Sequence, residues 1–202
     1  MKLPFFFSFI LFTAWLAFTI SRSRRKVANQ KNNFWERELA ANSTRRQPLD
    51  DLNYITIPFD TLPIHVMEKD ETIADCLRTL QSLADSPIVN FTGISNTDLK
   101  LQYGAPNIDI LSRYDQSYTT MVCTLQKWAE RLHEEGEEQA ARQVLEFAVS
   151  TDTDISGTYR LLASIYTASG EQTKIQELIE KAQGLRSGSK KIIVRTLQEF
   201  GQ

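Results

Sequence analysis

The feature that most constrains the fold is a repeat of 34 residues between Val122 and Leu185. Moving forward by that interval matches apolar or small residues with one another, and glycine with glycine, at the pairs Leu125/Tyr159, Trp128/Leu162, Ala129/Ala163, Leu132/Tyr166, Gly136/Gly170, Ala141/Ile175, Leu145/Ile179 and Ala148/Ala182. A fixed period of this length is typical of stacked helix pairs, in which each pair forms one structural unit. The sequence therefore predicts two successive helix–turn–helix units.

Each copy also has the internal pattern of two helices joined by a tight turn. An apolar stripe with i, i+3, i+4, i+7 spacing runs along the first helix of the first copy, at Leu125, Trp128, Ala129 and Leu132. Gly136 and Gly170 follow the first helix of their copies, where the chain must turn and a positive φ costs glycine least. The residues after them, Glu137 and Glu171, suit the positive N-terminal end of a second helix.

These residues resemble the tetratricopeptide repeat (TPR) family. The second copy has the family's order of aromatic, Leu, small and Tyr in its first helix, at Tyr159, Leu162, Ala163 and Tyr166. The first copy departs from that order, with Trp128 at the Leu position, and Thr153 stands where the family often has a closing Pro. The resemblance implies an all-α, TPR-like domain with its two repeats in residues 117–188. The alternative is an unrelated α-hairpin bundle with coincidental spacing.

The resemblance also implies a binding surface, because in peptide-binding members of the family the first helices of the repeats form a concave groove. The corresponding partner-binding positions are Gln126, Glu130 and His133 in the first copy and Arg160, Ser164 and Thr167 in the second. Members that grip a C-terminal carboxylate have Lys and Asn at such positions, so Gln126 and Glu130 do not favour that ligand. We expect Glu130 to form an ion pair with Arg160 between the repeats instead.

The first 20 residues are predicted to form a transmembrane anchor. Residues 3–20 are uncharged and rich in Phe, and as a helix they span about 27 Å, which is enough for a bilayer core. The alternative is a cleaved signal peptide, but only Lys2 precedes the apolar run and no A-x-A site follows it. The basic residues that come next predict a single-pass protein with its C-terminal domain in the cytoplasm; they are Arg22, Arg24, Arg25 and Lys26.

Charge divides the rest of the chain into two parts. Residues 21–46 contain eight Lys or Arg and two acidic residues, whereas residues 47–202 contain fourteen basic and twenty-three acidic residues. The basic juxtamembrane segment 21–47 either attracts anionic lipid headgroups or only sets the topology, and Phe34 and Trp35 could enter the membrane interface. The acidic domain argues against binding to nucleic acid, because it repels phosphates.

Three further segments flank the repeats. Residues 48–66 are β-prone but contain Pro58 and Pro63, so we expect an extended segment that either packs on the helical domain or occupies its groove. Residues 67–116 are expected to form a helical N-terminal cap or a degenerate repeat. Residues 189–202 are expected to form a C-terminal capping helix, because the terminal units of a repeat array need a cover.

Residues with chemistry are few. Cys76 and Cys123 lack metal-site spacing and are expected to be buried free thiols, which suits a reducing compartment. The two histidines, His65 and His133, stand in no catalytic motif, and the sequence contains neither a phosphate-binding loop nor a nucleophile elbow. We therefore expect neither an enzyme nor a cofactor nor a metal site.

The combined expectation is a membrane-anchored scaffold or adaptor that binds a protein or peptide partner through a TPR-like groove at the cytoplasmic face. The alternative is a structural subunit of a membrane protein assembly. An unrecognised enzyme is the third hypothesis, and it requires a deep pocket that contains His65, His133 or clustered carboxylates.

Overall fold

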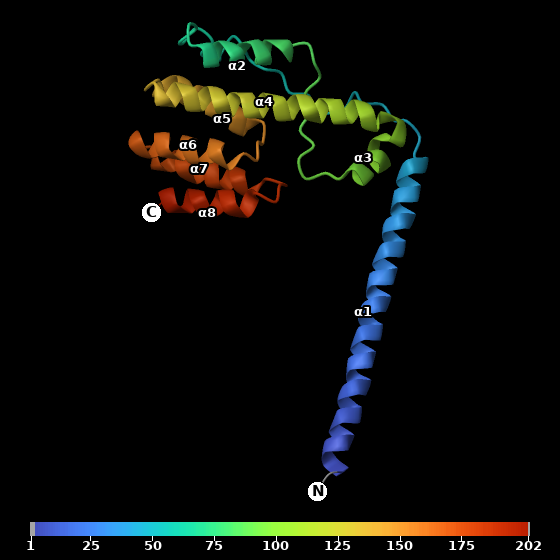
Figure 1. The fold of residues 1–202 in the computed structure, drawn as a ribbon. Helices are drawn as coiled ribbons and strands as arrows, with labels where there is room; N and C mark the ends of the chain where they lie inside the picture. The colour runs from blue at the N-terminus through green and yellow to red at the C-terminus, as the bar shows by residue number, and fades with distance from the viewer. Residues whose placement is uncertain (1–2, 202) are drawn as a thin grey trace. The chain divides into compact units, whose positions relative to one another are not determined.

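The computed structural model describes residues 3–201, and within this range it describes the side chains of residues 8–23 and 31–201. The described chain is all-α, as the sequence predicts, and its only β-type pairing is an isolated bridge between Tyr54 and Val89 (Figure 1). The helices are α1 (Leu3–Ser43), α2 (Glu71–Ser82), α3 (Asn96–Tyr103), the 3-10 helix η1 (Ala105–Asn107), α4 (Ile108–Glu134), α5 (Glu138–Ser150), α6 (Ser156–Ala168), α7 (Gln172–Gln183) and α8 (Lys190–Phe200). The chain divides into two compact units, Met1–Gln47 with Asn96–Asn107, and Pro48–Ser95 with Ile108–Gln202.

In the first unit, the C-terminal part of α1 packs on α3. Among the described side chains of these two helices, Ala41 and Leu99 are the buried apolar ones. At the edge of this contact, Nζ of Lys100 lies 2.6 Å from Oε1 of Glu38, and the Thr97 hydroxyl donates to Oε2 of the same carboxylate. Hydrogen bonds from Lys100 and then from Thr97 lower the pKa of Glu38. These contacts fix α3 against the last turns of α1.

The N-terminal part of α1 exposes large apolar side chains. Between Ser8 and Ser23 every described side chain is exposed, and the large apolar ones are Phe9, Ile10, Leu11, Phe12, Trp15, Leu16, Phe18 and Ile20. Among the described residues, no helix is both long and apolar enough to cross a membrane. The transmembrane helix expected over residues 1–20 is therefore not found in the described part, because the apolar run from Ser8 to Ile20 covers only about 20 Å of helix.

The first residues of that expected span, residues 1–7, lie outside the described side chains. The same holds for three of the four basic residues expected at the membrane surface, Arg24, Arg25 and Lys26, whereas Arg22 is described and exposed. The basic segment is continuous with the apolar one in α1, which extends to Ser43.

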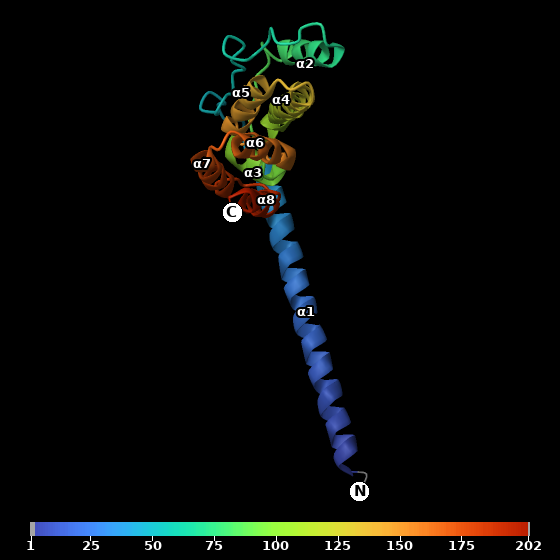
Figure 2. The same cartoon turned by 90° about the vertical axis from the view of Figure 1, so that its left-hand side faces the viewer.

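In the second unit, α4 to α8 form a stack in which each helix packs on the one before it (Figures 1 and 2). α2 packs on α4, and α6 also contacts α4 on one side and α8 on the other. All fourteen non-glycine positions of the 34-residue repeat are buried in this unit, which confirms the predicted repeat-like helical packing. α8 buries Ile193 and Leu197 against α6 and α7, the place expected for a capping helix.

The two turns of the repeat are built alike. Gly136 has a φ of 83° and Gly170 a φ of 73°, the left-handed conformation that the sequence predicts for these glycines. After each glycine, the amide of the next residue donates back into the helix: Glu137 N–H to Leu132 O and Glu171 N–H to Tyr166 O, both at 2.9 Å. These bonds satisfy carbonyls that a helix end leaves free, and they end α4 and α6 in the same way.

Two elements differ from the expectation. The first is α4, which runs from Ile108 to Glu134 without interruption and so joins residues expected in the N-terminal cap, 67–116, to the first helix of the first repeat. The reason is that no Gly or Pro lies between these residues, so nothing ends the helix.

The second difference is Cys123, which is exposed although Cys76 is buried as expected. Cys123 lies off the buried stripe formed by Met121, Val122 and Leu125.

The extended segment 48–66 packs on the helical domain. Its Ile55 amide donates a 2.9 Å hydrogen bond to Ile88 O, beside the bridge between Tyr54 and Val89. Ile57 and Leu62 belong to the buried core. The segment therefore completes the core of the second unit and does not form a sheet.

Candidate functional site

The residues predicted to line the groove lie on α4 and α6 and differ in exposure. Gln126 is only 8% exposed, because its side chain joins the two helices. The Thr158 hydroxyl donates a 2.6 Å hydrogen bond to Oε1 of Gln126, and Nε2 of Gln126 donates a 2.7 Å bond to Oε1 of Glu130. The amide of Gln126 thus already has partners on both sides.

The ion pair expected between Glu130 and Arg160 is not formed in the described chain, because the Glu130 carboxylate accepts from Gln126 instead. On α6, Arg160 and Thr167 are exposed and Ser164 is half-buried. The hydroxyls of Ser164 and Thr167 donate to carbonyls of their own helix, whereas the exposed guanidinium of Arg160 has no hydrogen bond or ion pair within the described residues.

His133 lies at the C-terminal end of α4. Its Nδ1 is 2.8 Å from Oε1 of Glu138, but within the described residues this nitrogen has no hydrogen-bond partner. The other histidine, His65, lies in the extended segment with Nδ1 2.6 Å from Oε1 of Glu68, and its side chain is 84% exposed. In the described part of the chain, no cluster of His, Cys, Asp or Glu could hold a metal ion.

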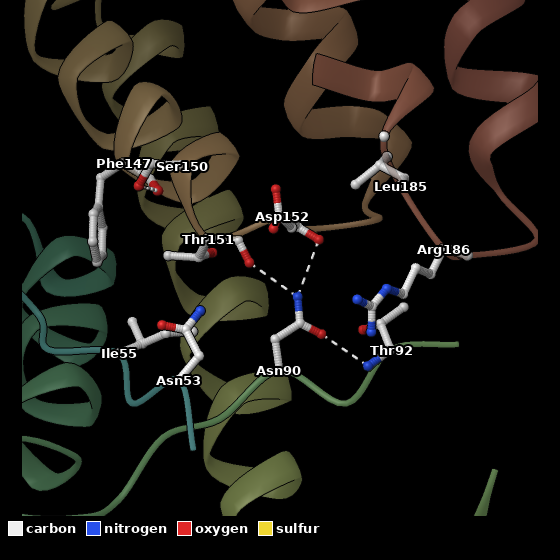
Figure 3. Close-up of a pocket in the computed structure, with 12 residues that line it drawn as sticks. Asn53, Ile55, Asn90, Thr92, Phe147, Ser150, Thr151, Asp152, Leu185 and Arg186 are labelled. Carbon is white, nitrogen blue, oxygen red and sulfur yellow. Dashed lines mark hydrogen bonds between the residues drawn. The ribbon is translucent and has the colours of Figure 1, made fainter. Parts of the chain in front are cut away.

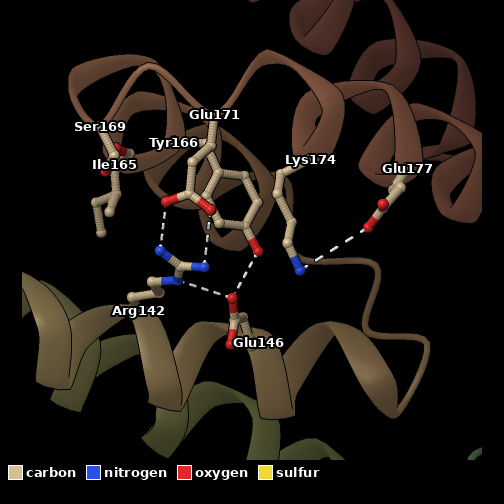
Figure 4. A network of polar contacts seen from close by, with 8 residues as sticks. All are labelled: Arg142, Glu146, Ile165, Tyr166, Ser169, Glu171, Lys174 and Glu177. Atoms are coloured by element: carbon tan, nitrogen blue, oxygen red, sulfur yellow. Dashed lines mark hydrogen bonds and ion pairs between the residues drawn. The ribbon is translucent and has the colours of Figure 1, made fainter.

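A polar network joins the second helix of one repeat to the next repeat (Figure 4). Arg142 on α5 donates to both oxygens of Glu171, at 2.5 and 3.1 Å, and its Nε donates at 2.9 Å to Oε1 of Glu146. The guanidinium carbon lies 5.1 Å from the centre of the Tyr166 ring, whose hydroxyl also donates to Glu146. Burial raises the pKa of Glu146, but the hydrogen bonds from Arg142 and Tyr166 lower it more, so Glu146 remains charged at neutral pH.

The structure has a polar cavity of about 490 Å³ in the second unit (Figure 3). Four separate segments form its walls: Asn53 and Ile55 of the extended segment, Asn90 and Thr92 after α2, Phe147 and Ser150 at the end of α5 with Thr151 and Asp152 after it, and the loop Gly184–Ser187 after α7. The cavity is within the size range of ligand sites. Neither His65 nor His133 is among its lining residues, and Asp152 is the carboxylate that lines it.

The floor of the cavity is held by Asn90. Its side-chain amide donates to the carbonyls of Thr151 and Asp152, at 3.0 and 3.2 Å, and its Oδ1 accepts from the Thr92 amide at 2.8 Å. The hydroxyl of Tyr118 reaches the same Thr151 carbonyl at 3.1 Å, and burial raises the pKa of Tyr118. The polar groups of this floor satisfy one another, which makes the floor rigid.

The opposite wall depends on a glycine. Gly93 has a φ of 80°, and a Cβ at this position would lie 2.7 Å from the carbonyl oxygen of Arg186. The loop after α7 can therefore approach the segment after α2 only because residue 93 has no side chain. The Ser187 hydroxyl fixes the same loop with a 2.5 Å bond to Oδ2 of Asp154.

The sequence does not predict this cavity. Its four segments are far apart in the chain, and the residues that line it belong to no motif.

Comparison with known proteins gave no matching family model, no matching curated protein and no matching solved structure.

Proposed function

We propose that this chain is a membrane-anchored protein-interaction scaffold, with its helical-repeat domain of TPR type on the cytoplasmic side. The observation that carries the proposal is the exposed polar face on the first helices of the two repeats. Lys127 and Glu130 on α4 and Arg160 and Thr167 on α6 are exposed there, whereas the opposite sides of both helices are buried. A face of this kind offers a groove for a segment of a partner protein.

The apolar part of α1 supports the anchor. Trp15 is 61% and Phe18 is 64% exposed, and they lie among six other exposed large apolar side chains. A helix that is apolar on all sides needs an apolar environment, which a lipid bilayer supplies. In this proposal the basic residues Arg22, Arg24, Arg25 and Lys26 face the cytoplasm, according to the positive-inside rule.

A structural subunit of a membrane assembly is the second candidate, and Phe34, Trp35 and Leu39 favour it. They are 56%, 54% and 69% exposed, and they lie on α1 beyond the apolar run. In a straight helix, Phe34 is about 21 Å from Ile20, which is beyond the headgroup region of a bilayer that ends at Ile20. A neighbouring subunit is then the surface that covers these side chains.

The test is crosslinking and affinity capture of the full-length chain from membranes of the cells that make it. The variant is Arg160→Glu, and the matched control is Arg78→Glu, which reverses the charge of an exposed arginine on α2. The groove proposal expects a partner that Arg160→Glu loses and Arg78→Glu retains, while the circular dichroism of both variants stays unchanged. A partner retained by both variants binds elsewhere and contradicts the groove.

The two candidates differ in how the chain behaves alone. A scaffold purified in neutral detergent without a partner is expected to be monodisperse and to unfold cooperatively. A subunit with obligate partners is expected to aggregate under the same conditions, because its intersubunit surfaces are uncovered.

A further inference from the structure

The cavity between the extended segment and the ends of α5 and α7 has free polar groups on two of its walls. In the part of the chain that the structure describes, the guanidinium of Arg186 and the carboxamide of Asn53 have neither an ion pair nor a side-chain hydrogen bond. Arg186 extends from the loop after α7 toward the centre of the cavity, and Asn53 lies on the other side (Figure 3). These two groups are therefore free to bind a ligand.

The other charged group in the lining is neutralised. Asp152 lies at the edge of the cavity, and its Oδ1 is 2.5 Å from Nζ of Lys181. Asp154, just outside the lining, accepts from the Ser187 hydroxyl. A ligand in the cavity therefore meets one uncompensated positive charge, that of Arg186, with two carboxylates nearby.

The charges around the cavity determine which anion it favours. A single guanidinium matches one carboxylate, with which it can form a bidentate pair. A phosphate carries nearly two negative charges, so one arginine leaves it partly uncompensated, and the nearby carboxylate of Asp154, which accepts from a hydroxyl, repels it further. The cavity therefore favours a carboxylate over a phosphate.

The remaining lining favours a peptide over a small acid. Ile55 and Phe147 form a partly buried apolar wall next to Asn53 (Figure 3). The Asn53 carboxamide can donate to and accept from a peptide bond, and the apolar wall can receive an apolar side chain. A cavity of about 490 Å³ is large enough for a few residues of an extended chain.

We propose that this cavity binds a short segment of another protein that presents a carboxylate to Arg186 and an apolar side chain to Ile55 and Phe147. The site lies at the ends of the second helices of the repeats, not on the face of the first helices. It is therefore a second interaction site, independent of the groove proposed above.

The test selects short random peptides displayed on phage against the immobilised full-length chain in neutral detergent. The enriched peptides are expected to share an Asp or Glu near an apolar residue. Fluorescence anisotropy of one labelled peptide is then measured against the wild-type chain, Arg186→Gln, and the matched control Arg195→Gln, which removes an exposed arginine of α8. We expect Arg186→Gln to weaken binding about tenfold or more and Arg195→Gln to leave it unchanged.

A double-mutant cycle assigns the carboxylate to Arg186. The peptide with Gln in place of its acidic residue is expected to bind wild type about as weakly as the original peptide binds Arg186→Gln, with little further loss when both changes are combined. Asn53→Ala is the second variant, because it tests the other wall without touching the loop that Gly93 holds, and it is expected to weaken binding too.

Three results overturn the proposal: no peptide enriched above the uncoated surface, equal binding to wild type and Arg186→Gln, or tighter binding when phosphoserine replaces the acidic residue. The Arg160→Glu variant separates this site from the groove. It is expected to bind the selected peptides as wild type does, even if it loses the partner captured from membranes.

Discussion

The hydroxyl of Thr158 donates a 2.6 Å hydrogen bond to Oε1 of Gln126, and this buried bond joins the first helices of the two repeats. Gly157 lies against the same carboxamide, since a Cβ there would lie 2.9 Å from Nε2 of Gln126. A residue that the repeat pattern places in a binding groove thus links the repeats to each other.

Replacing Gln126 by Ala is expected to destabilise the fold by about 1–3 kcal/mol, because the change leaves the buried Thr158 hydroxyl without its acceptor. Urea unfolding followed by circular dichroism measures this. Thr158→Val and the double variant complete a cycle, and the double variant is expected to cost less than the sum of the two single changes. Strict additivity would show that the two side chains do not interact.

Gly93 and Gly136 form a matched pair for testing the cavity wall. Both have a positive φ, 80° and 83°, but a Cβ at Gly136 would have no atom within 4 Å, whereas one at Gly93 would meet Arg186. Gly136→Ala is expected to cost about 1 kcal/mol, from backbone strain alone. Gly93→Ala is expected to cost clearly more, because the loop after α7 must also move away. The melting temperatures of the two variants measure these losses of stability. Equal losses would mean that the loop after α7 moves away without a cost in stability.

Asp70 is predicted to make stability depend on pH. Its carboxylate accepts from Arg131 at 2.7 and 2.9 Å and caps α2 through the Ile73 amide at 3.1 Å. The hydrogen bonds from Arg131, followed by that from Ile73, hold the pKa of Asp70 below its ordinary value of 3.8. Because the folded pKa is the lower one, this stabilisation is complete above the ordinary pKa and is lost as the pH falls through the folded value.

Asp70→Asn keeps a good capping residue but removes the charge, so it isolates this effect. At pH 7 the variant is expected to unfold at a lower urea concentration than wild type. The difference in urea midpoint between wild type and Asp70→Asn is expected to narrow steadily at pH values below about 4. Asp70→Ala also loses the cap and is the control, since its difference from Asp70→Asn does not depend on titration. If this difference in urea midpoint were the same at neutral and acidic pH, the stabilisation by Asp70 would come from capping and not from its charge.

The repeat could be predicted from the sequence because its information is local and periodic. Leu125 and Tyr159 are buried where the 34-residue spacing places them, and Gly136 and Gly170 turn as glycines must. Helix periodicity and the conformational freedom of glycine decide these features within each repeat, so a single sequence contains them.

The cavity could not be predicted, because it depends on which segments meet. Asn53, Asn90 and Arg186 lie on three connecting segments whose paths are decided by packing rather than by local preference. The same limit explains Gln126 and Cys123. The helical pattern places both near one face of α4, but only the position of α6 buries the first and leaves the second exposed.

The two cysteines are expected to react with a thiol reagent at very different rates. Cys123 is exposed on α4, whereas Cys76 is buried on α2, and burial raises the pKa of its thiol. Native protein is expected to take up one equivalent of 5,5′-dithiobis(2-nitrobenzoate) rapidly and the second only when the fold opens, because the thiolate is the reactive form. Cys123→Ser is expected to abolish the fast phase. Rapid uptake of two equivalents would show that α2 separates readily from α4.

The network around Arg142 is predicted to strengthen the joint between the repeats. Arg142→Met removes the bonds to Glu171 and Glu146, and the Arg142 side chain is only 18% exposed. We expect a loss of about 1 kcal/mol, because both partner carboxylates keep access to water and incur no full burial penalty. Arg78→Met is the control, since among the described residues Arg78 pairs with Asp75 alone and its side chain is 75% exposed; it is expected to change stability by less than about 0.5 kcal/mol.

The position of this network makes a second readout possible. In a stack of helix pairs, stability depends on the contacts between neighbours, and Arg142 belongs to α5 while Glu171 directly precedes α7. Arg142→Met is therefore expected to speed amide hydrogen exchange in α6 and α7 more than in α4. A uniform increase along the whole second unit would instead mean that the variant lowers global stability and that the network is not specific to the joint.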